Sequence, residues 1–134
     1  MPESRELNLW VVLHRPEQPK GDWAAHCLEI DVVSQGRSPR HAIEMVAEAI
    51  VMTLRADITK KRLPSRRRAP DEFWDELWDI LRNSEPTSLA KSSAGAIALA
   101  GQLVLRVESK PRRRAAHPWE VPALWASKTR DAHP

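Results

Sequence analysis

The stretch from Trp23 to Leu54 constrains the fold of this chain more than any other segment. Two short apolar runs, at residues 23–28 and 32–35, are separated by a Glu-Ile-Asp turn, and Gly36 closes the second run. Ser38-Pro39 then marks a helix start, because a serine hydroxyl can accept a backbone N–H there and proline suits the first helical turn. The stretch therefore predicts two strands, a glycine turn and a capped helix.

An alternating pattern precedes this stretch and predicts an earlier strand. Apolar side chains recur at every second position, the period of a β-strand: Leu7, Leu9, Val11 and Leu13. Trp10 and Val12, on the opposite side, are also apolar, so we expect both faces of this strand to be covered. Short connections between the three strands favour an antiparallel meander.

The helix after the glycine turn should cover residues 39–58 and end before Pro64. Its main apolar stripe should lie on the sheet and contains Ile43, Val46, Ala47, Ile50, Leu54 and Ile58. A second, softer strip of small and flexible side chains contains Ala42, Met45, Ala49 and Met52. Either the next helix or another chain can cover this strip, and the sequence leaves both alternatives open.

The next helix is expected at residues 71–82, where a proline and two acids suit a helix N-terminus. One face is apolar and contains Phe73, Trp74, Leu77, Trp78, Ile80 and Leu81. The other face carries five carboxylates: Asp71, Glu72, Asp75, Glu76 and Asp79. Apolar alternation returns later and predicts a strand at residues 102–108.

These elements predict an α+β fold, in which a small antiparallel meander sheet is covered by helices. The order is β-β-β-α, followed by a second helix and the late strand. The length of 134 residues suits one domain. We expect a core at residues 1–83, a linker and late strand packed on it at 84–108, and a flexible, basic, proline-rich tail at 109–134.

Positive charge is concentrated in two runs, although the net charge is only +3. Their candidate nucleic-acid-binding residues are Arg66, Arg67, Arg68, Arg112, Arg113 and Arg114. Such runs can contact phosphates, but beside prolines they are also typical of solvated linkers.

The sequence predicts a cytoplasmic protein that does not interact with a membrane. No stretch approaches the ~20 apolar residues that span a bilayer, and the first residues lack the apolar core of a secretory signal. Cys27 is the single cysteine, so no internal disulfide can form.

No group in the sequence predicts catalysis, a cofactor or a metal site. Asp22, Glu29 and Asp31 flank the strands, but they match no specific ligand spacing. Glu44 and Glu48 lie one turn apart on a helix face that also carries basic side chains, which favours solvated ion pairs. Cys27 follows His26 on a strand, so the two side chains point to opposite faces and cannot pair directly.

Three groups of residues occur in an order that is typical of a known family. They are the run Trp23-Ala24-Ala25-His26-Cys27-Leu28-Glu29-Ile30-Asp31, the turn Val33-Ser34-Gln35-Gly36, and Ala42 with Glu48-Ala49 on the helix. Over residues 7–58 the chain thus resembles the HicB family of bacterial antitoxins. His41 departs from the pattern, because the family more often has an acid in this first helical turn, and this should weaken the cap slightly.

The resemblance implies a partial RNase H-like fold without nuclease activity, which binds and masks a small ribonuclease toxin and assembles as a homo-oligomer. Many members of the family also bind promoter DNA through a C-terminal domain. Here no pair of helices after Ser84 can place one in a major groove, so the sequence leaves promoter binding open. The candidate partner-binding residues are Met45, Met52, Asp71, Glu72, Asp75, Glu76 and Asp79.

The leading hypothesis is therefore a non-enzymatic, HicB-like antitoxin that works through protein–protein contact. The alternative is a nucleic-acid-binding module that uses the two arginine runs. A third hypothesis is a metal-dependent nuclease, whose activity would disappear on Asp31→Asn or Glu48→Gln.

Overall fold

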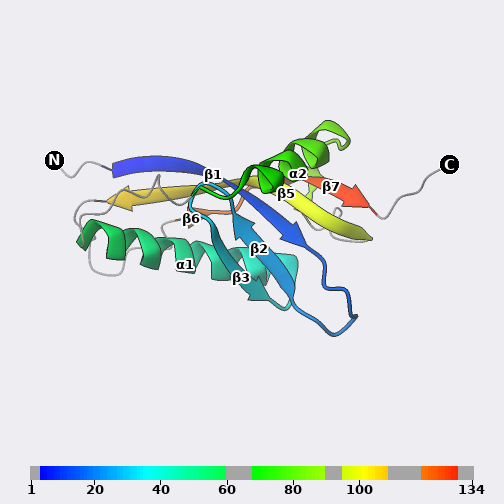
Figure 1. Cartoon of the computed structure of the whole chain (residues 1–134), viewed down its shortest axis with the longest axis horizontal. Helices are drawn as coiled ribbons and strands as arrows, with labels where there is room; N and C mark the ends of the chain where they lie inside the picture. The colour runs from blue at the N-terminus through cyan, green and yellow to red at the C-terminus, as the bar shows by residue number, and fades with distance from the viewer. Residues whose placement is uncertain (1–3, 60–67, 90–94, 109–118, 130–134) are drawn as a thin grey trace.

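The computed structural model describes residues 4–59, 68–89, 95–108 and 119–129. Within these ranges the chain forms a seven-stranded antiparallel sheet and two helices, which confirms the expected α+β class (Figure 1). The strands are β1 (Ser4–His14), β2 (Trp23–Cys27), β3 (Val32–Gly36), β4 (Thr87–Ser88), β5 (Ala96–Glu108), β6 (Trp119–Glu120) and β7 (Leu124–Thr129). The helices are α1 (Pro39–Thr59) and α2 (Asp71–Arg82).

The sheet has the order β3-β2-β1-β5-β7-β4, and β6 pairs with β5. The first three strands form the expected meander. β5 pairs with β1 along its length, with Leu7 opposite Leu105 and Val11 opposite Gly101. β5 begins at Ala96 rather than at residue 102, because both of its faces are covered at its start and the alternation of apolar and polar residues is therefore lost there.

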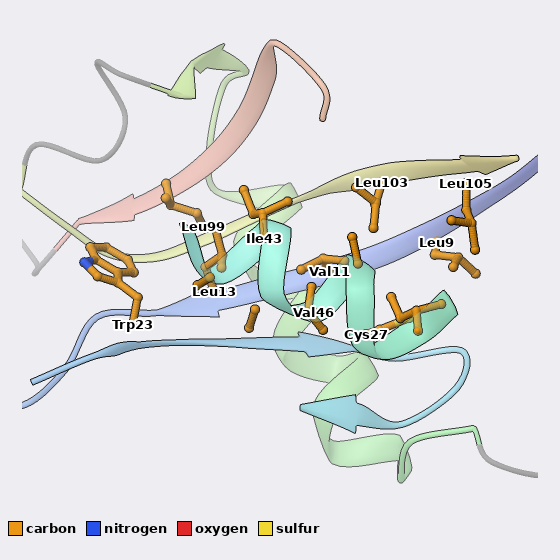
Figure 2. Packing of buried hydrophobic residues seen from close by; sticks show 14 of the residues in the cluster. Leu9, Val11, Leu13, Trp23, Cys27, Ile43, Val46, Leu99, Leu103 and Leu105 are labelled. Atoms are coloured by element: carbon orange, nitrogen blue, oxygen red, sulfur yellow. The ribbon is translucent and has the colours of Figure 1, made fainter. Parts of the chain in front are cut away.

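α1 covers one face of the sheet. Its side chains Ile43 and Val46 are fully buried against Val11 and Leu13 of β1 (Figure 2), and Ile50 is fully buried in the same core. The predicted apolar stripe is confirmed from Ile43 to Leu54, while the side chain of Ile58 lies outside the described residues.

α2 covers the opposite face of the sheet (Figure 1). Leu77 and Ile80 are buried there with Val12 and two small residues of β5, Ala98 and Ala100. Because α2 and α1 lie on opposite faces, α2 cannot cover the second strip of α1, and that alternative is wrong.

The start of α1 has the expected cap. The backbone N–H of His41 donates a hydrogen bond of 3.1 Å to the Ser38 hydroxyl. The ring Nδ1 of His41 in turn accepts the backbone N–H of Arg37 at 3.0 Å. The His41 side chain therefore satisfies a further backbone donor at the cap. That an acid at this position would make a stronger cap stays a prediction.

The segment expected to be a flexible tail contains β6 and β7, which pair with β5. Trp125 of β7 is only 1% exposed and packs on Gly101. Residues 119–129 therefore belong to the sheet. Residues 96–108 form one of its central strands, so the core does not end at residue 83 as expected. The rest of the predicted tail lies outside the described residues.

Candidate interaction surface on helix α2

α2 is held on the sheet by its buried side and by hydrogen bonds at its N-terminal end. The ring Nε1–H of Trp74 donates to the carbonyl of Ala69 at 3.2 Å. The Ala69 N–H donates to the carbonyl of Leu28 at 2.8 Å, which ties the residues before α2 to the end of β2. The opposite side of the helix faces outward and carries the predicted carboxylates.

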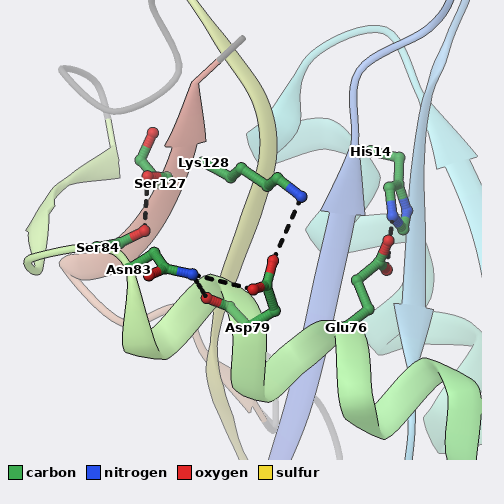
Figure 3. Close-up of polar contacts among 7 residues, drawn as sticks. All are labelled: His14, Glu76, Asp79, Asn83, Ser84, Ser127 and Lys128. Atoms are coloured by element: carbon green, nitrogen blue, oxygen red, sulfur yellow. Dashed lines mark hydrogen bonds and ion pairs between the residues drawn. The ribbon is translucent and has the colours of Figure 1, made fainter. Parts of the chain in front are cut away.

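Two of these carboxylates contact side chains of the sheet, although both remain partly exposed (Figure 3). Glu76 accepts a hydrogen bond of 2.8 Å from the ring Nε2 of His14 on β1, and this bond lowers the pKa of the Glu76 carboxyl. Asp79 lies 3.4 Å from the Lys128 ammonium of β7 and accepts the side-chain amide of Asn83 at 2.9 Å. Glu76 and Asp79 therefore brace α2 against the sheet.

A third carboxylate is paired with a neighbouring arginine. Arg68 donates to Asp71 at 2.9 Å, and its guanidinium lies 4.6 Å from the centroid of the Trp74 ring. Glu72 and Asp75 are exposed, and neither forms an ion pair with another described residue. Of the five predicted carboxylates, these two are exposed and form no ion pair with a described residue, whereas Asp71 is exposed but paired.

Three tryptophans form a cluster where α2 crosses β1. The Trp78 ring lies 6.1 Å from Trp10 in an edge-to-face arrangement and 6.4 Å from Trp74 in a tilted one. Trp78 is 45% exposed, whereas the sequence had assigned it to the buried face. The sequence does indicate this patch, because the apolar side chains of α2 cover a wider part of the helix surface than the sheet can bury.

On β2 and the turn after it, the polar side chains serve the fold. His26 is only 7% exposed, lies 2.6 Å from the Asp31 carboxylate and meets the Phe73 ring edge-on at 4.9 Å. The Glu29 carboxylate accepts the backbone N–H of Trp10 at 2.8 and 3.0 Å, and burial raises its pKa.

The described residues contain no group of three His, Cys, Asp or Glu side chains that could hold a metal ion. Glu44, a candidate ligand by sequence, lies 3.6 Å from Arg40 on the outer side of α1. Cys27 is buried, and burial together with the nearby Glu29 raises its pKa to about 12, so the thiolate is disfavoured at neutral pH.

The predicted partner-binding residues fall on two separate surfaces. Met52 is 64% exposed and Met45 is half-buried, and both lie on α1, across the sheet from the carboxylates of α2. Of the six arginines proposed for nucleic acid, only Arg68 is described, and it is engaged by Asp71 and Trp74. Arg66, Arg67, Arg112, Arg113 and Arg114 lie outside the described residues.

Among the described residues, no helix is both long enough and apolar enough to cross a bilayer.

Comparisons with protein-family models, with curated proteins and with solved structures found no significant match. The HicB resemblance therefore stays a prediction from the sequence.

Proposed function

We propose that this chain is a non-enzymatic binding protein of the HicB-like antitoxin type, which masks a small ribonuclease toxin through protein–protein contact. The observation that carries the proposal is the outward side of α2, where Glu72, Asp75 and part of the Trp78 ring are exposed on one helix.

The chemistry of such a toxin supports this surface as its binding site. A ribonuclease must present positive charge to bind the phosphates of RNA. Exposed carboxylates on α2 would attract that surface, which raises the association rate and favours the correct partner. A tryptophan beside them would supply contact area, as aromatic residues do at the centres of protein interfaces.

The order of residues between Trp23 and Ala49 supports the antitoxin type. The partial RNase H-like fold, the homo-oligomer and the cytoplasmic location are parts of the same proposal. Size-exclusion chromatography with light scattering of the full chain measures the oligomer.

The test begins with the reading frame next to this one, which should encode a small basic protein with ribonuclease activity. Added in excess, the full chain should form a complex with that protein and suppress its cleavage of RNA. If the neighbouring frame encodes such a ribonuclease and this chain neither binds nor inhibits it, the proposal is wrong.

Charge reversal then tests the surface itself. The double variant Glu72→Lys and Asp75→Lys should lower the association rate about tenfold or more at low salt, and the difference should shrink as salt rises. The double variant Glu17→Lys and Glu85→Lys is the matched control, because both residues are exposed acids outside α2. Equal rates for the double variant and the original chain would remove α2 from the interface.

The alternative, a nucleic-acid-binding module, depends on arginines of which Arg68 alone is described. Because Arg68 is bound within the chain, no described contact favours this function. A gel shift that shows no complex at low salt would exclude it.

A further inference from the structure

α2 contains the same pair of residue types twice, one helical turn apart. Asp71 precedes Trp74 by three positions, and Asp75 precedes Trp78 by three positions. Residues at this spacing are neighbours on a helix surface, so each carboxylate lies beside the indole that follows it. The two pairs differ in what occupies them.

The first pair holds an arginine of the chain itself. The Nη1 atom of Arg68 lies 2.9 Å from the Asp71 carboxylate, and its guanidinium carbon lies 4.6 Å from the centroid of the Trp74 ring. One guanidinium thus forms an ion pair and a cation–π contact at the same time. This combination suits arginine, whose planar group stacks on an aromatic ring while its N–H groups bond a carboxylate.

The second pair has no such cation among the described residues. Asp75 is exposed, and Trp78 remains 45% exposed although its ring touches Trp10 and Trp74. Arg68 pairs with Asp71 and Lys128 pairs with Asp79. Arg82, four positions after Trp78 on α2, is exposed and forms neither an ion pair with Asp75 nor a cation–π contact with Trp78. The two neighbouring rings hold Trp78 in place, so its exposed surface is already positioned for a ligand.

We propose that Asp75 and Trp78 form a docking site for an arginine side chain of a protein partner, bound as Arg68 is bound by Asp71 and Trp74. The identity of that partner as a basic protein rests on the proposed function, whereas the site itself rests on the repeated pair. The carboxylates of Glu72 and Asp75 would repel phosphates, which favours a protein over a nucleic acid as the ligand.

The test uses the full chain and three short capped peptides that differ at one residue, which is arginine, lysine or the neutral isostere citrulline. Binding is followed by the NMR shift of the Trp78 indole N–H, assigned with Trp78→Phe. The arginine peptide should shift this signal in a saturable way, the lysine peptide should bind more weakly, and the citrulline peptide should not bind measurably.

Two variants test the two halves of the site. Asp75→Asn and Trp78→Ala should each weaken the arginine peptide about fivefold, as expected for one exposed ion pair or one cation–π contact. Trp78→Ala is followed through the backbone amide of Asp75. Glu85→Gln is the control, because it removes an equal charge at an exposed position outside α2. If Trp78→Ala does not fold, Asp75→Asn decides, since Asp75 has no described partner to lose.

Equal binding of the arginine and citrulline peptides, or unchanged affinity in Asp75→Asn, would overturn the site. If a ribonuclease partner still binds both variants normally, the proposed function stands and the arginine site is wrong. If the arginine peptide binds as described but no toxin-type partner does, the site stands and the proposed function is wrong.

Discussion

Glu29 and Glu76 are both partly buried, yet the protein shifts their pKa values in opposite directions. Burial raises the pKa of Glu29, although its carboxylate accepts the backbone N–H of Trp10. The hydrogen bond from His14 lowers the pKa of Glu76 by more than burial raises it. Compared with the unfolded chain, the folded state therefore favours the protonated form of Glu29 and the ionised form of Glu76.

The two glutamates should give opposite contributions to the pH dependence of stability. Because the pKa of Glu29 is higher in the folded state than its ordinary value of 4.5, the protein loses unfolding free energy as pH rises from 4.5 through the folded pKa. Glu29→Gln removes the titrating group, so this loss should become smaller. Because the pKa of Glu76 is lower in the folded state than its ordinary value of 4.5, the protein loses unfolding free energy as pH falls from 4.5 through the folded pKa. Glu76→Gln should make this loss smaller.

Urea denaturation at a series of pH values measures both slopes. Glu85→Gln, at an exposed position, is the control and should leave both slopes unchanged. The same slope change from Glu29→Gln and Glu76→Gln would contradict the opposite shifts.

At the scale of elements, two glycines allow close packing between neighbours. A Cβ atom built at Gly36 would lie 2.3 Å from the backbone nitrogen of Ala42, in the first turn of α1. A Cβ atom at Gly101 would lie 2.6 Å from the ring of Trp125. The first contact sets how closely α1 approaches the edge strand β3, and the second lets β7 place its tryptophan flat on β5.

Gly36→Ala should destabilise the fold by about 1–3 kcal/mol, because the backbone of α1 must move away from β3 to admit the methyl group. Gly101→Ala should destabilise the fold by a similar amount. In a Trp125→Leu background the same substitution should be less destabilising, because the ring that clashes with the new methyl group is absent. Thermal or urea unfolding measures each difference. Gln35→Ala, exposed and next to Gly36, is the control, and an equal cost for it would show that the clash is not the cause.

At the scale of the whole molecule, the sheet draws its strands from both ends of the chain. β1 and β5 pair along their lengths, and β7 adds the next strand beyond β5. Trp125 of β7 joins the core on the α1 side, while Ala126 joins the core on the α2 side. The last strands therefore stabilise both layers at once.

A chain that ends before residue 119 should be largely unfolded. It loses buried Trp125, a change that alone costs about 3–5 kcal/mol, compared with a total stability of about 5–15 kcal/mol for a typical domain. A chain that ends at Thr129 keeps β6 and β7 and is the control. Circular dichroism and amide hydrogen exchange measure the outcome, and native exchange protection in the shorter chain would contradict it.

The sequence by itself determined the local elements. Alternation predicted β1, the cap at Ser38 predicted the start of α1, and the apolar stripes gave both helices within one residue of their ends. It also identified the acidic face of α2, which contains the two carboxylates of the candidate site. These features depend on side chains close in sequence, and such patterns report which face of an element is buried.

The tertiary structure alone decided what lies against each face. Three features depend on residues distant in sequence: α2 lies on the far side of the sheet, β7 pairs with β5, and Glu76 and Asp79 contact side chains of the sheet. The exposure of Trp78 likewise depends on how far α2 extends over β1. A periodic pattern shows that an apolar face must be buried but does not name its partner, because burial lowers the free energy whichever apolar surface provides it.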